Sequence, residues 1–284
     1  MQGKICMITG ANSGIGYETA LALAKMGAHV VMVSRNRTKG EAAQSTIKTQ
    51  SGNPSVDLLI ADFSVQQSIH DLAAAFKAKY NRLDVLVNNA GGAVGKRQLT
   101  AEGYEMNFAV NHLGYFLLTN LLLDLLKASA PARIVNVTSS AQAFGKINFD
   151  DLMLEKNFRT AYAYSQSKAA NIIFTYELAK RLAGTGVTAN SVHPGAVRTN
   201  FGSTSDGFLG IFVVVARPFE LSPEQGAQTL IYLASSPEVE GVTGKYYHKK
   251  RTLKSNSQTY DPAVQQRLWQ VSEQLTNIAA QTTD

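Results

Sequence analysis

The chain has 284 residues, 45% of them apolar and 17% charged, with a formal net charge of +6 and a sequence pI near 9.3. This composition is that of an ordinary globular protein and excludes a largely disordered chain. The basic residues are scattered, apart from residues 249–251, and no nucleic-acid-binding motif accompanies them, so nucleic acid is not an expected partner. The single cysteine, Cys6, excludes an internal disulfide.

The sequence also gives expectations about location and metals. The N-terminus leads directly into an apolar run, without the pattern of a signal peptide. The most apolar stretches, residues 113–126 and 208–216, contain polar residues or are too short to span a bilayer, so no transmembrane segment is expected. A lone cysteine fits a reducing, cytoplasmic compartment. No group of His, Cys, Asp and Glu has metal-ligand spacing, so no metal is expected.

The chain begins with a strand, a glycine-rich turn and a helix. Residues 4–9 predict a buried strand, and an amphipathic helix is expected to about residue 26. The turn has the spacing Gly-x-x-x-Gly-x-Gly, which lets the backbone approach a pyrophosphate at the helix start. A ligand-free turn is the alternative, but the context favours dinucleotide binding. The residues expected to bind there are Gly10, Asn12, Ser13, Gly14, Ile15 and Gly16.

A second strand, residues 29–33, indicates which dinucleotide is preferred. It ends at Ser34-Arg35-Asn36-Arg37, where NAD-binding sites usually carry an acidic residue for the ribose 2′-hydroxyl. An arginine accommodates a 2′-phosphate instead, so Arg35 favours NADP. The alternative is that Arg35 and Arg37 are solvated loop charges.

Further βα units follow, each with polar residues after its strand. A helix is expected over residues 38–50, a strand over 56–61 and a helix over 69–80. Asp62 either contacts an adenine edge or caps the helix after it. The next strand, residues 83–87, runs into Asn88-Asn89-Ala90-Gly91-Gly92, a turn suited to packing backbone against a flat ligand, though these are also common turn residues.

The residues that indicate a chemical step most directly are the pair Tyr164 and Lys168. A long helix is predicted over residues 106–126, with Asn111 inside it, and a strand over 133–137 that ends at Ser139-Ser140. On the helix predicted over residues 161–182, Tyr164 and Lys168 are an i, i+4 pair and share one face. A cation close to a phenol favours phenolate, so the lysine is expected to lower the pKa of Tyr164 toward the working range. A chance pairing on a surface helix is the alternative.

The last third of the chain completes one α/β domain, residues 1–284. A strand over 187–192 is followed by His193-Pro194-Gly195, and the apolar connection 195–221 is expected to be a substrate-binding lid. A helix over 223–235, a strand near 244–247 and a helix over 262–279 follow. The βα alternation predicts a Rossmann-type, doubly wound parallel sheet of about seven strands, with helices on both faces and ligands at the carboxyl ends of the strands.

Together the motifs resemble the short-chain dehydrogenase/reductase family along nearly the whole chain. Six motifs occur in the family's order: Thr9-Gly10-x-x-x-Gly14-Ile15-Gly16, Asn88-Asn89-Ala90-Gly91, Asn111, Ser140, Tyr164-x-x-x-Lys168 and Pro194-Gly195. Within the family the chain is most similar to the retinol-dehydrogenase-like branch, through residues 9–18, 133–137, 244–247 and 267–269.

The resemblance implies a role for each reactive residue. Tyr164 would exchange a proton with the substrate oxygen, and Lys168 would lower the pKa of Tyr164 and hold the nicotinamide ribose. Ser140 would hydrogen-bond the substrate oxygen, in preference to Ser139, and Asn111 would anchor a water relay to Lys168. The further cofactor contacts that it implies are Asp62, Phe63, Asn89, Ala90, Gly91, Pro194, Gly195, Val197 and Thr199.

The chain departs from the family pattern in three ways. Residues 144–160 extend the connection between Ser140 and Tyr164, as in the retinol-dehydrogenase-like and protochlorophyllide-reductase groups, and would shape the substrate pocket or obstruct a helix-to-helix dimer. The N-terminal anchor of many retinol dehydrogenases is absent from the sequence. Ser13 stands where some NADP-preferring members have a basic residue, so NADP depends on Arg35, with NAD as the alternative.

The expected function is NADP(H)-dependent interconversion of a small apolar aldehyde or ketone and its alcohol by a monomer or homodimer. One alternative is C=C reduction of the protochlorophyllide-reductase type, for which a cysteine near the substrate would be expected, whereas Cys6 lies in the first strand. A second is a non-catalytic dinucleotide-binding scaffold, since fold alone does not fix function.

Overall fold

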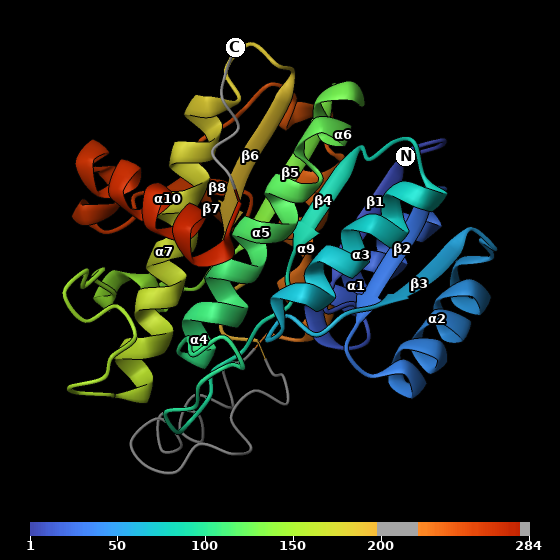
Figure 1. Ribbon diagram of the computed structural model, residues 1–284. Coiled ribbons are helices and arrows are strands. Elements are labelled where there is room, and N and C mark those ends of the chain that lie inside the picture. Colours follow the sequence, from blue (N-terminus) through green and yellow to red (C-terminus); the bar gives the residue numbers. More distant parts are fainter. Residues whose placement is uncertain (198–220, 279–284) are drawn as a thin grey trace.

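An eight-stranded sheet forms the centre of the computed structural model, which describes residues 1–197 and 221–278 (Figure 1). The strand order is β3-β2-β1-β4-β5-β6-β7-β8; β8 pairs antiparallel with β7, and all the other pairings are parallel. The strands are β1 (Ile5–Thr9), β2 (His29–Ser34), β3 (Val56–Ile60), β4 (Val85–Asn88), β5 (Ala132–Val137), β6 (Val187–Val192), β7 (Tyr246–His248) and β8 (Arg251–Leu253). This confirms the doubly wound fold, with one edge strand more than expected.

Helices cover both faces of the sheet, as the βα alternation predicts. Helices α1, α2 and α9 pack on one face, and α3, α5 and α7 lie on the other, where α10 packs onto α7 (Figure 1). The helices of the described residues are α1 (Gly14–Lys25), α2 (Arg37–Ser51), α3 (Gln66–Lys79), α4 (Met106–Phe108), α5 (Gly114–Leu121), α6 (Leu123–Ala128), α7 (Thr160–Arg181), α9 (Pro223–Ser235) and α10 (Pro262–Thr276).

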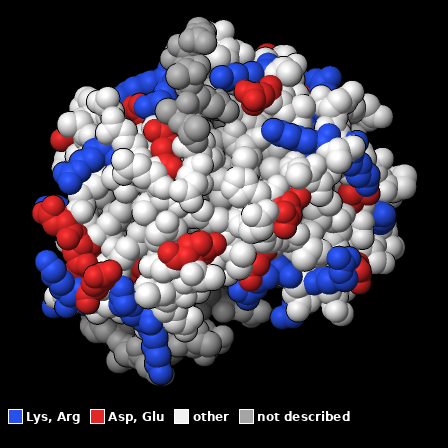
Figure 2. Space-filling model, viewed as in Figure 1, with Lys and Arg blue, Asp and Glu red and all other residues white. Residues whose placement is uncertain are grey.

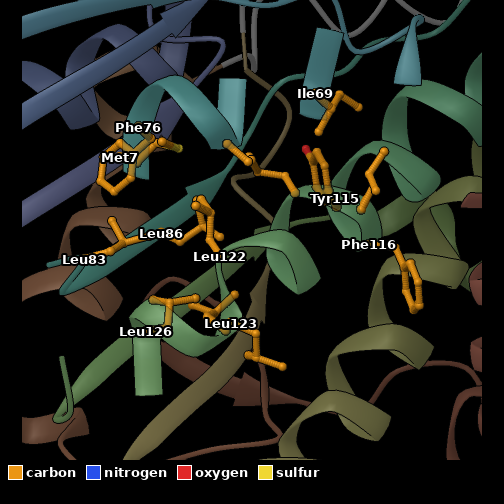
Figure 3. Packing of buried hydrophobic residues seen from close by; sticks show 14 of the residues in the cluster. Met7, Ile69, Phe76, Leu83, Leu86, Tyr115, Phe116, Leu122, Leu123 and Leu126 are labelled. Carbon is orange, nitrogen blue, oxygen red and sulfur yellow. The ribbon is translucent and has the colours of Figure 1, made fainter. Parts of the chain in front are cut away.

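Alternate strand residues supply two separate hydrophobic cores. On β1, Met7 packs in the core under α3 and α5, while Cys6 and Ile8 face the core under α1 and α9. Successive strand side chains point to opposite faces, so a strand covered on both sides must be apolar throughout, as residues 5–8 are. Figure 3 shows the first core, in which Phe76 and Tyr115 lie with aliphatic side chains from β4 and α6.

Residues 106–126 are helical, as predicted, but they do not form one regular α-helix. After α4 the helix continues through a π-helical turn, η1 (Ala109–Leu113), into α5, and it is interrupted at Leu122 before α6. A π turn carries one more residue than an α turn and often occurs at functional sites. Asn111 lies in this turn and is fully buried.

Two further expectations concern the membrane and the lid. Among residues 1–197 and 221–278, no helix has both the length and the apolar character needed to cross a bilayer. The cytoplasmic location stays a prediction. Most of the proposed lid lies outside the described residues; of residues 195–221, only Gly195, Ala196, Val197 and Leu221 are described.

On the face shown in Figure 2, Lys and Arg side chains are interspersed with Asp and Glu.

Candidate active site

The glycine turn after β1 forms a cradle of backbone. Gly10 and Gly14 have φ values of +67° and +59°, in the left-handed region that favours glycine. A Cβ on Gly16 would lie 2.4 Å from both the carbonyl oxygen of Gly10 and Nδ2 of Asn89, so only glycine fits. The start of α1 has no side-chain cap, since Ser13 accepts no capping hydrogen bond. Its N–H groups can therefore bind an anion, and the cradle fits a dinucleotide phosphate.

The side chains expected near the adenosine end differ in how engaged they are. Arg35 is exposed, and the described residues provide no ion pair for it, whereas Arg37 pairs with Glu41 at 3.6 Å. Asp62 accepts hydrogen bonds from N and Oγ of Ser64, at 2.9 and 2.7 Å, so its carboxylate stabilises the turn before α3. The side chain of Phe63 is buried in the core. Of the four, Arg35 is the side chain with a free charge.

The turn after β4 is tied to the glycine cradle. Nδ2 of Asn89 donates to the carbonyl oxygen of Thr9 at 2.8 Å, and Oγ1 of Thr9 accepts from the backbone N–H groups of Asn89 and Ala90. The turn thus fixes the end of β1 and brings Gly91 toward the reactive residues. A Cβ on Gly91 would lie 2.3 Å from Oδ1 of Asn111 and 3.7 Å from Nζ of Lys168.

Two asparagines hold the loop that follows. Asn111 accepts from N–H of Gly92 and donates to its carbonyl oxygen, both at 2.9 Å, and it also donates to Oγ of Ser167 at 3.0 Å. Asn107, one turn earlier, accepts from N–H of Val94 at 2.8 Å and donates to its carbonyl oxygen at 3.4 Å. Each amide pairs with both backbone groups of one residue, so the loop has little freedom to move.

A buried carboxylate orients the second of these amides. Glu105 is fully buried and accepts three hydrogen bonds, from the side-chain amide of Asn107 (2.7 Å) and from N–H of Asn107 and Phe108. Because Nδ2 of Asn107 is held by Glu105, its Oδ1 is directed at Val94. Sequence reasoning missed both residues. The available signal was Glu105 at the start of a helix, two residues before Asn107.

Ser139, and not Ser140, lies beside Tyr164. The Ser139 side chain hydrogen-bonds Tyr164, and it also caps the short 3-10 helix η2 (Ser140–Phe144) by accepting from N–H of Ala141. Ser140 is exposed. The choice of Ser140 is therefore corrected: the chain turns into η2 directly after Ser139, so the next side chain points to a different side.

Burial dominates the acid–base properties of the pair on α7. It raises the pKa of Tyr164 to about 12, although the hydrogen bond with Ser139 acts in the opposite direction. It lowers the pKa of the Lys168 ammonium, whose side chain is 4% exposed, to about 7. The expected lowering of the tyrosine pKa is thus not seen, because loss of solvation favours the neutral form of both groups.

Lys168 is nonetheless placed between the parts of the site. Its Nζ donates to the carbonyl oxygen of Val137 at 3.3 Å and lies 5.6 Å from the ring centroid of Tyr164. It also lies 5.8 Å from the ring centroid of Tyr115 on α5. The lysine therefore connects the end of β5, α7 and the turn at Gly91.

The insertion at residues 144–160 packs against the loop that follows Gly92 and against α7. Oγ1 of Thr160 donates to the carbonyl oxygen of Gly95 at 2.7 Å, and Nε of Arg97 donates to that of Met153 at 3.3 Å. Gln166 on α7 accepts from N–H of Asn148 and donates to the carbonyl oxygen of Leu152. The insertion thus links α7 to the loop held by Asn107, which supports a role in shaping the pocket; the dimer alternative stays untested.

The turn after β6 packs against Leu221 and the start of α9. Gly195 has φ +97°, and a Cβ on it would lie 2.6 Å from Cδ1 of Leu221, so it marks a close backbone approach. Val197 forms an isolated bridge with Leu221 and contacts the Gly226 position of α9, as does Ile15 of the glycine turn. Thr199 lies outside the described residues.

Three histidines near the site, His112, His193 and His248, pack against other parts of the fold. His193 and His248 stack at the ends of β6 and β7 with ring centroids 4.6 Å apart, and burial lowers the pKa of His193 to about 4. Burial also lowers the pKa of His112 to about 3, and its Nε2 hydrogen-bonds Oγ of Ser272 on α10 at 2.8 Å. The described residues contain no group of three or more potential metal ligands.

Comparison with known proteins gives a consistent result. The family model described as short chain dehydrogenase matches residues 4–207. Retinol dehydrogenase 14 of Homo sapiens is 45% identical over 289 residues, covering 96% of this chain and 86% of that protein. Retinol dehydrogenase 12 of Mus musculus is 45% identical over 276 residues, covering 97% and 87%.

Solved structures agree in fold. An uncharacterized protein from Mycobacterium paratuberculosis superimposes with a TM-score of 0.79 at 34% identity, covering 97% of this chain and 94% of that one. The RhlG/NADP active-site complex of Pseudomonas aeruginosa superimposes with a TM-score of 0.69 at 29% identity, covering 87% and 94%.

Proposed function

The chain belongs to the short-chain dehydrogenase family of nicotinamide-dependent oxidoreductases, and from that premise we propose that it interconverts an apolar aldehyde or ketone and its alcohol with NADP(H). The observation that carries the proposal is the meeting of Tyr164, Ser139 and Lys168 beside the turn at Gly91, at the carboxyl edge of the sheet. In open α/β sheets this edge is where ligands bind.

Tyr164 and Ser139 supply the proton chemistry in this proposal. When a carbonyl is reduced, negative charge develops on its oxygen, and two hydroxyl donors on that oxygen stabilise the charge. The nicotinamide, when bound, supplies the hydride. With its pKa raised to about 12, Tyr164 stays protonated at neutral pH and can donate to the oxygen. The reverse direction requires phenolate, so oxidation is expected to accelerate as the pH rises, while reduction changes little below pH 10.

Lys168 and Asn111 position the reacting groups. Asn111 holds Gly92 by both backbone groups and reaches Ser167, which lies between Tyr164 and Lys168 on α7. Nζ of Lys168 lies close to the Gly91 position, where it can contact a ribose of the cofactor. Holding reactants and catalytic groups in a fixed geometry lowers the entropic part of the barrier. These two residues therefore align the tyrosine with the cofactor site.

Arg35 supports NADP over NAD. It is exposed after β2, where the ribose 2′ position of a bound dinucleotide lies in this fold, and its guanidinium is unpaired among the described residues. A phosphate on that position would gain a bidentate, charge-assisted partner. The NADP complex of a similar structure supports the same choice.

A retinoid is a reasonable first substrate, because four of the similar proteins are named retinol dehydrogenases 11, 12, 13 and 14. The C=C reductase alternative gains no support: Cys6 is buried in β1, and burial raises its pKa to about 12. No observation favours the scaffold alternative either, since each reactive residue type that the chemistry requires is present.

The test is NADPH consumption with a panel of aldehydes and ketones that includes retinal, with Tyr164→Phe as the control. We expect turnover by the wild type and a loss of at least about 10³-fold in kcat for Tyr164→Phe, which removes the proton donor. The same panel with NADH measures the cofactor preference. No turnover on any substrate, with NADPH bound, would favour the scaffold.

A further inference from the structure

The segment Ser255–Tyr260, called the C-terminal segment below, hydrogen-bonds to the short helix η2, which begins directly after Ser139. Nδ2 of Asn256 donates to the carbonyl oxygens of Gln142 and Gly145, at 2.6 and 2.7 Å. The backbone N–H of Asn256 donates to Oε1 of Gln142 at 3.0 Å. One residue, more than a hundred positions later in the chain, thus binds η2 at its middle and at its end.

Gln258 of the same segment makes a second contact, with the backbone of Ile147. Oε1 of Gln258 accepts from N–H of Ile147 at 2.8 Å, and its Nε2 lies 3.5 Å from the carbonyl oxygen of Ile147. The hydroxyl of Tyr246 on β7 hydrogen-bonds the side chain of Gln142. Side chains of the C-terminal segment therefore hold the backbone at residues 142, 145 and 147, and Tyr246 of β7 holds the side chain of Gln142.

The helix η2 lies directly against the part of α7 that carries Tyr164. A Cβ on Gly145 would lie 2.0 Å from the carbonyl oxygen of Ser165, so at this point the two backbones are in contact. Ser139 begins the same short helix and hydrogen-bonds Tyr164. Contacts at both ends of η2 thus set the distance between the two hydroxyls.

A five-residue 3-10 helix does not hold this geometry alone. Short helices of this type have poor internal hydrogen bonds, and isolated turns are unstable in water. Phe144, the last residue of η2, is 82% exposed and contributes little packing. The bonds from Asn256 and Gln258 therefore add to the Ser139 cap and the contact with α7 in fixing η2.

The C-terminal segment is also held in place by hydrogen bonds that do not involve η2. Oγ of Ser255 hydrogen-bonds the hydroxyl of Tyr176 on α7 at 2.9 Å and Oγ1 of Thr259 at 2.6 Å. Nε2 of Gln265 on α10 donates to the carbonyl oxygen of Thr259 at 2.6 Å. The segment can thus remain in place when its bonds to η2 are removed, so the two roles can be tested apart.

We propose that Asn256 is a positioning residue for catalysis, which acts through η2 to align Ser139 with Tyr164, and that Gln258 assists it. This inference rests on the proposed function. Neither residue touches the reacting atoms, so the expected signature is a loss in kcat with an unchanged KM for NADPH. Because the hydrogen bond from Ser139 lowers the pKa of Tyr164, misalignment also moves the alkaline rise of the oxidation rate to higher pH.

Asn256→Asp is the decisive variant, compared with Gln258→Glu and Ser257→Ala. The aspartate removes both side-chain donors and places an oxygen against two carbonyl oxygens, so we expect a 10- to 100-fold fall in kcat, the size that misplacement by about 1 Å causes. Gln258→Glu keeps the 2.8 Å bond from Ile147, so its loss is expected to be about two- to fivefold. Ser257→Ala changes an exposed residue of the same segment that contributes none of the hydrogen bonds described above, so kcat is expected to stay within about twofold.

Each outcome has one meaning, provided that rates are measured well below the Tm of every variant. If Asn256→Asp lowers the Tm but keeps its kcat and pH profile, the residue is merely structural and the inference is overturned. If the wild type turns over and Tyr164→Phe does not, the proposed function stands whatever Asn256→Asp does. If the wild type does not turn over, both fall together.

Discussion

The carboxyl edge of the sheet has two halves that are built differently. Around β1 and β2 the site is made of backbone: the glycine turn needs no partner beyond the neighbouring strand ends, and Gly16 approaches Gly10 only six residues away. Around β4, β5 and β6 the site is made of side chains that bridge distant segments. Asn111 reaches Ser167 across 56 residues, and Asn256 reaches Gln142 across 114.

This difference separates binding from catalysis. Phosphate binding needs only N–H groups at a helix start, which a short local sequence provides. Aligning a tyrosine, a serine and a lysine from two chain segments needs a scaffold that is rigid in three dimensions. In this chain amide side chains provide that rigidity, because one amide can both donate to and accept from a single backbone residue.

The largest effect is expected from the two serines at the end of β5. Ser139→Ala removes a donor to the reacting oxygen and should lower kcat by about 10²- to 10³-fold, as loss of one such donor does. Ser140→Ala, the matched control, changes an exposed residue and should leave kcat within about threefold. Steady-state kinetics of carbonyl reduction checks both, and the reverse ranking would restore the choice made from the sequence.

The backbone half is tested by Gly16→Ala. The added Cβ would lie 2.4 Å from the carbonyl oxygen of Gly10, which cannot move without opening the cradle. We expect an approximately 100-fold rise in the Kd for NADPH and a loss of stability of about 1–3 kcal/mol, as for other overpacked sites. Gly103→Ala is the control: its φ is +84° but nothing lies within 4 Å of the added Cβ, so it costs stability alone. Fluorescence titration with NADPH distinguishes the two.

A smaller effect is expected at Arg35. Arg35→Ala should raise the KM for NADPH by about 10- to 30-fold and leave that for NADH within about twofold, because a hydrogen bond to a charged group contributes roughly 1.5–3 kcal/mol. Arg37→Ala, which breaks only the exposed pair with Glu41, should change neither. Equal effects on the two coenzymes would remove the basis for the NADP preference.

Much of the fold could be predicted from the sequence, because it follows from local patterns. The βα alternation, the glycine turn and the i, i+4 relation of Tyr164 and Lys168 are local patterns, and the structure reproduces each of them. The predicted helix Pro223–Ser235 has the observed bounds, because Ser222 and Gln225 form a capping box that is visible in the sequence.

The sequence did not predict three features of the site, because local patterns of residues do not show them. The π turn at residues 109–113 could not be seen, because most residues from 113 to 123 are apolar and leave no clear helical period for an extra residue to shift. The choice between Ser139 and Ser140 depends on where the chain turns into η2 after β5, a turn in which Ser139 accepts a hydrogen bond from N–H of Ala141. The raised pKa of Tyr164 depends on burial, for which the spacing of Tyr and Lys gives no measure.

The last prediction concerns the free energy of unfolding and the buried lysine. Burial lowers the pKa of Lys168 to about 7, from 10.5. Between these two pH values the unfolded chain binds more protons than the folded one, so stability rises with pH across that window, and the cost of the buried lysine is greatest below pH 7. Lys168→Met removes this cost. The carbonyl oxygen of Val137 keeps its hydrogen bond from Asn171 at 3.2 Å, so no acceptor is left unpaired.

We therefore expect Lys168→Met to be inactive but more stable than the wild type, by on the order of 3 kcal/mol at pH 7, with the difference shrinking as the pH approaches 10.5. Denaturant unfolding at pH 6, 7, 8 and 9 measures it, and Lys39→Met, at an exposed position on α2, should stay within about 0.5 kcal/mol of the wild type throughout. A difference independent of pH would mean that the lysine keeps its charge when buried. The two halves of the site would then differ only in whether backbone or side chains build them. The buried catalytic lysine would not lower the free energy of unfolding.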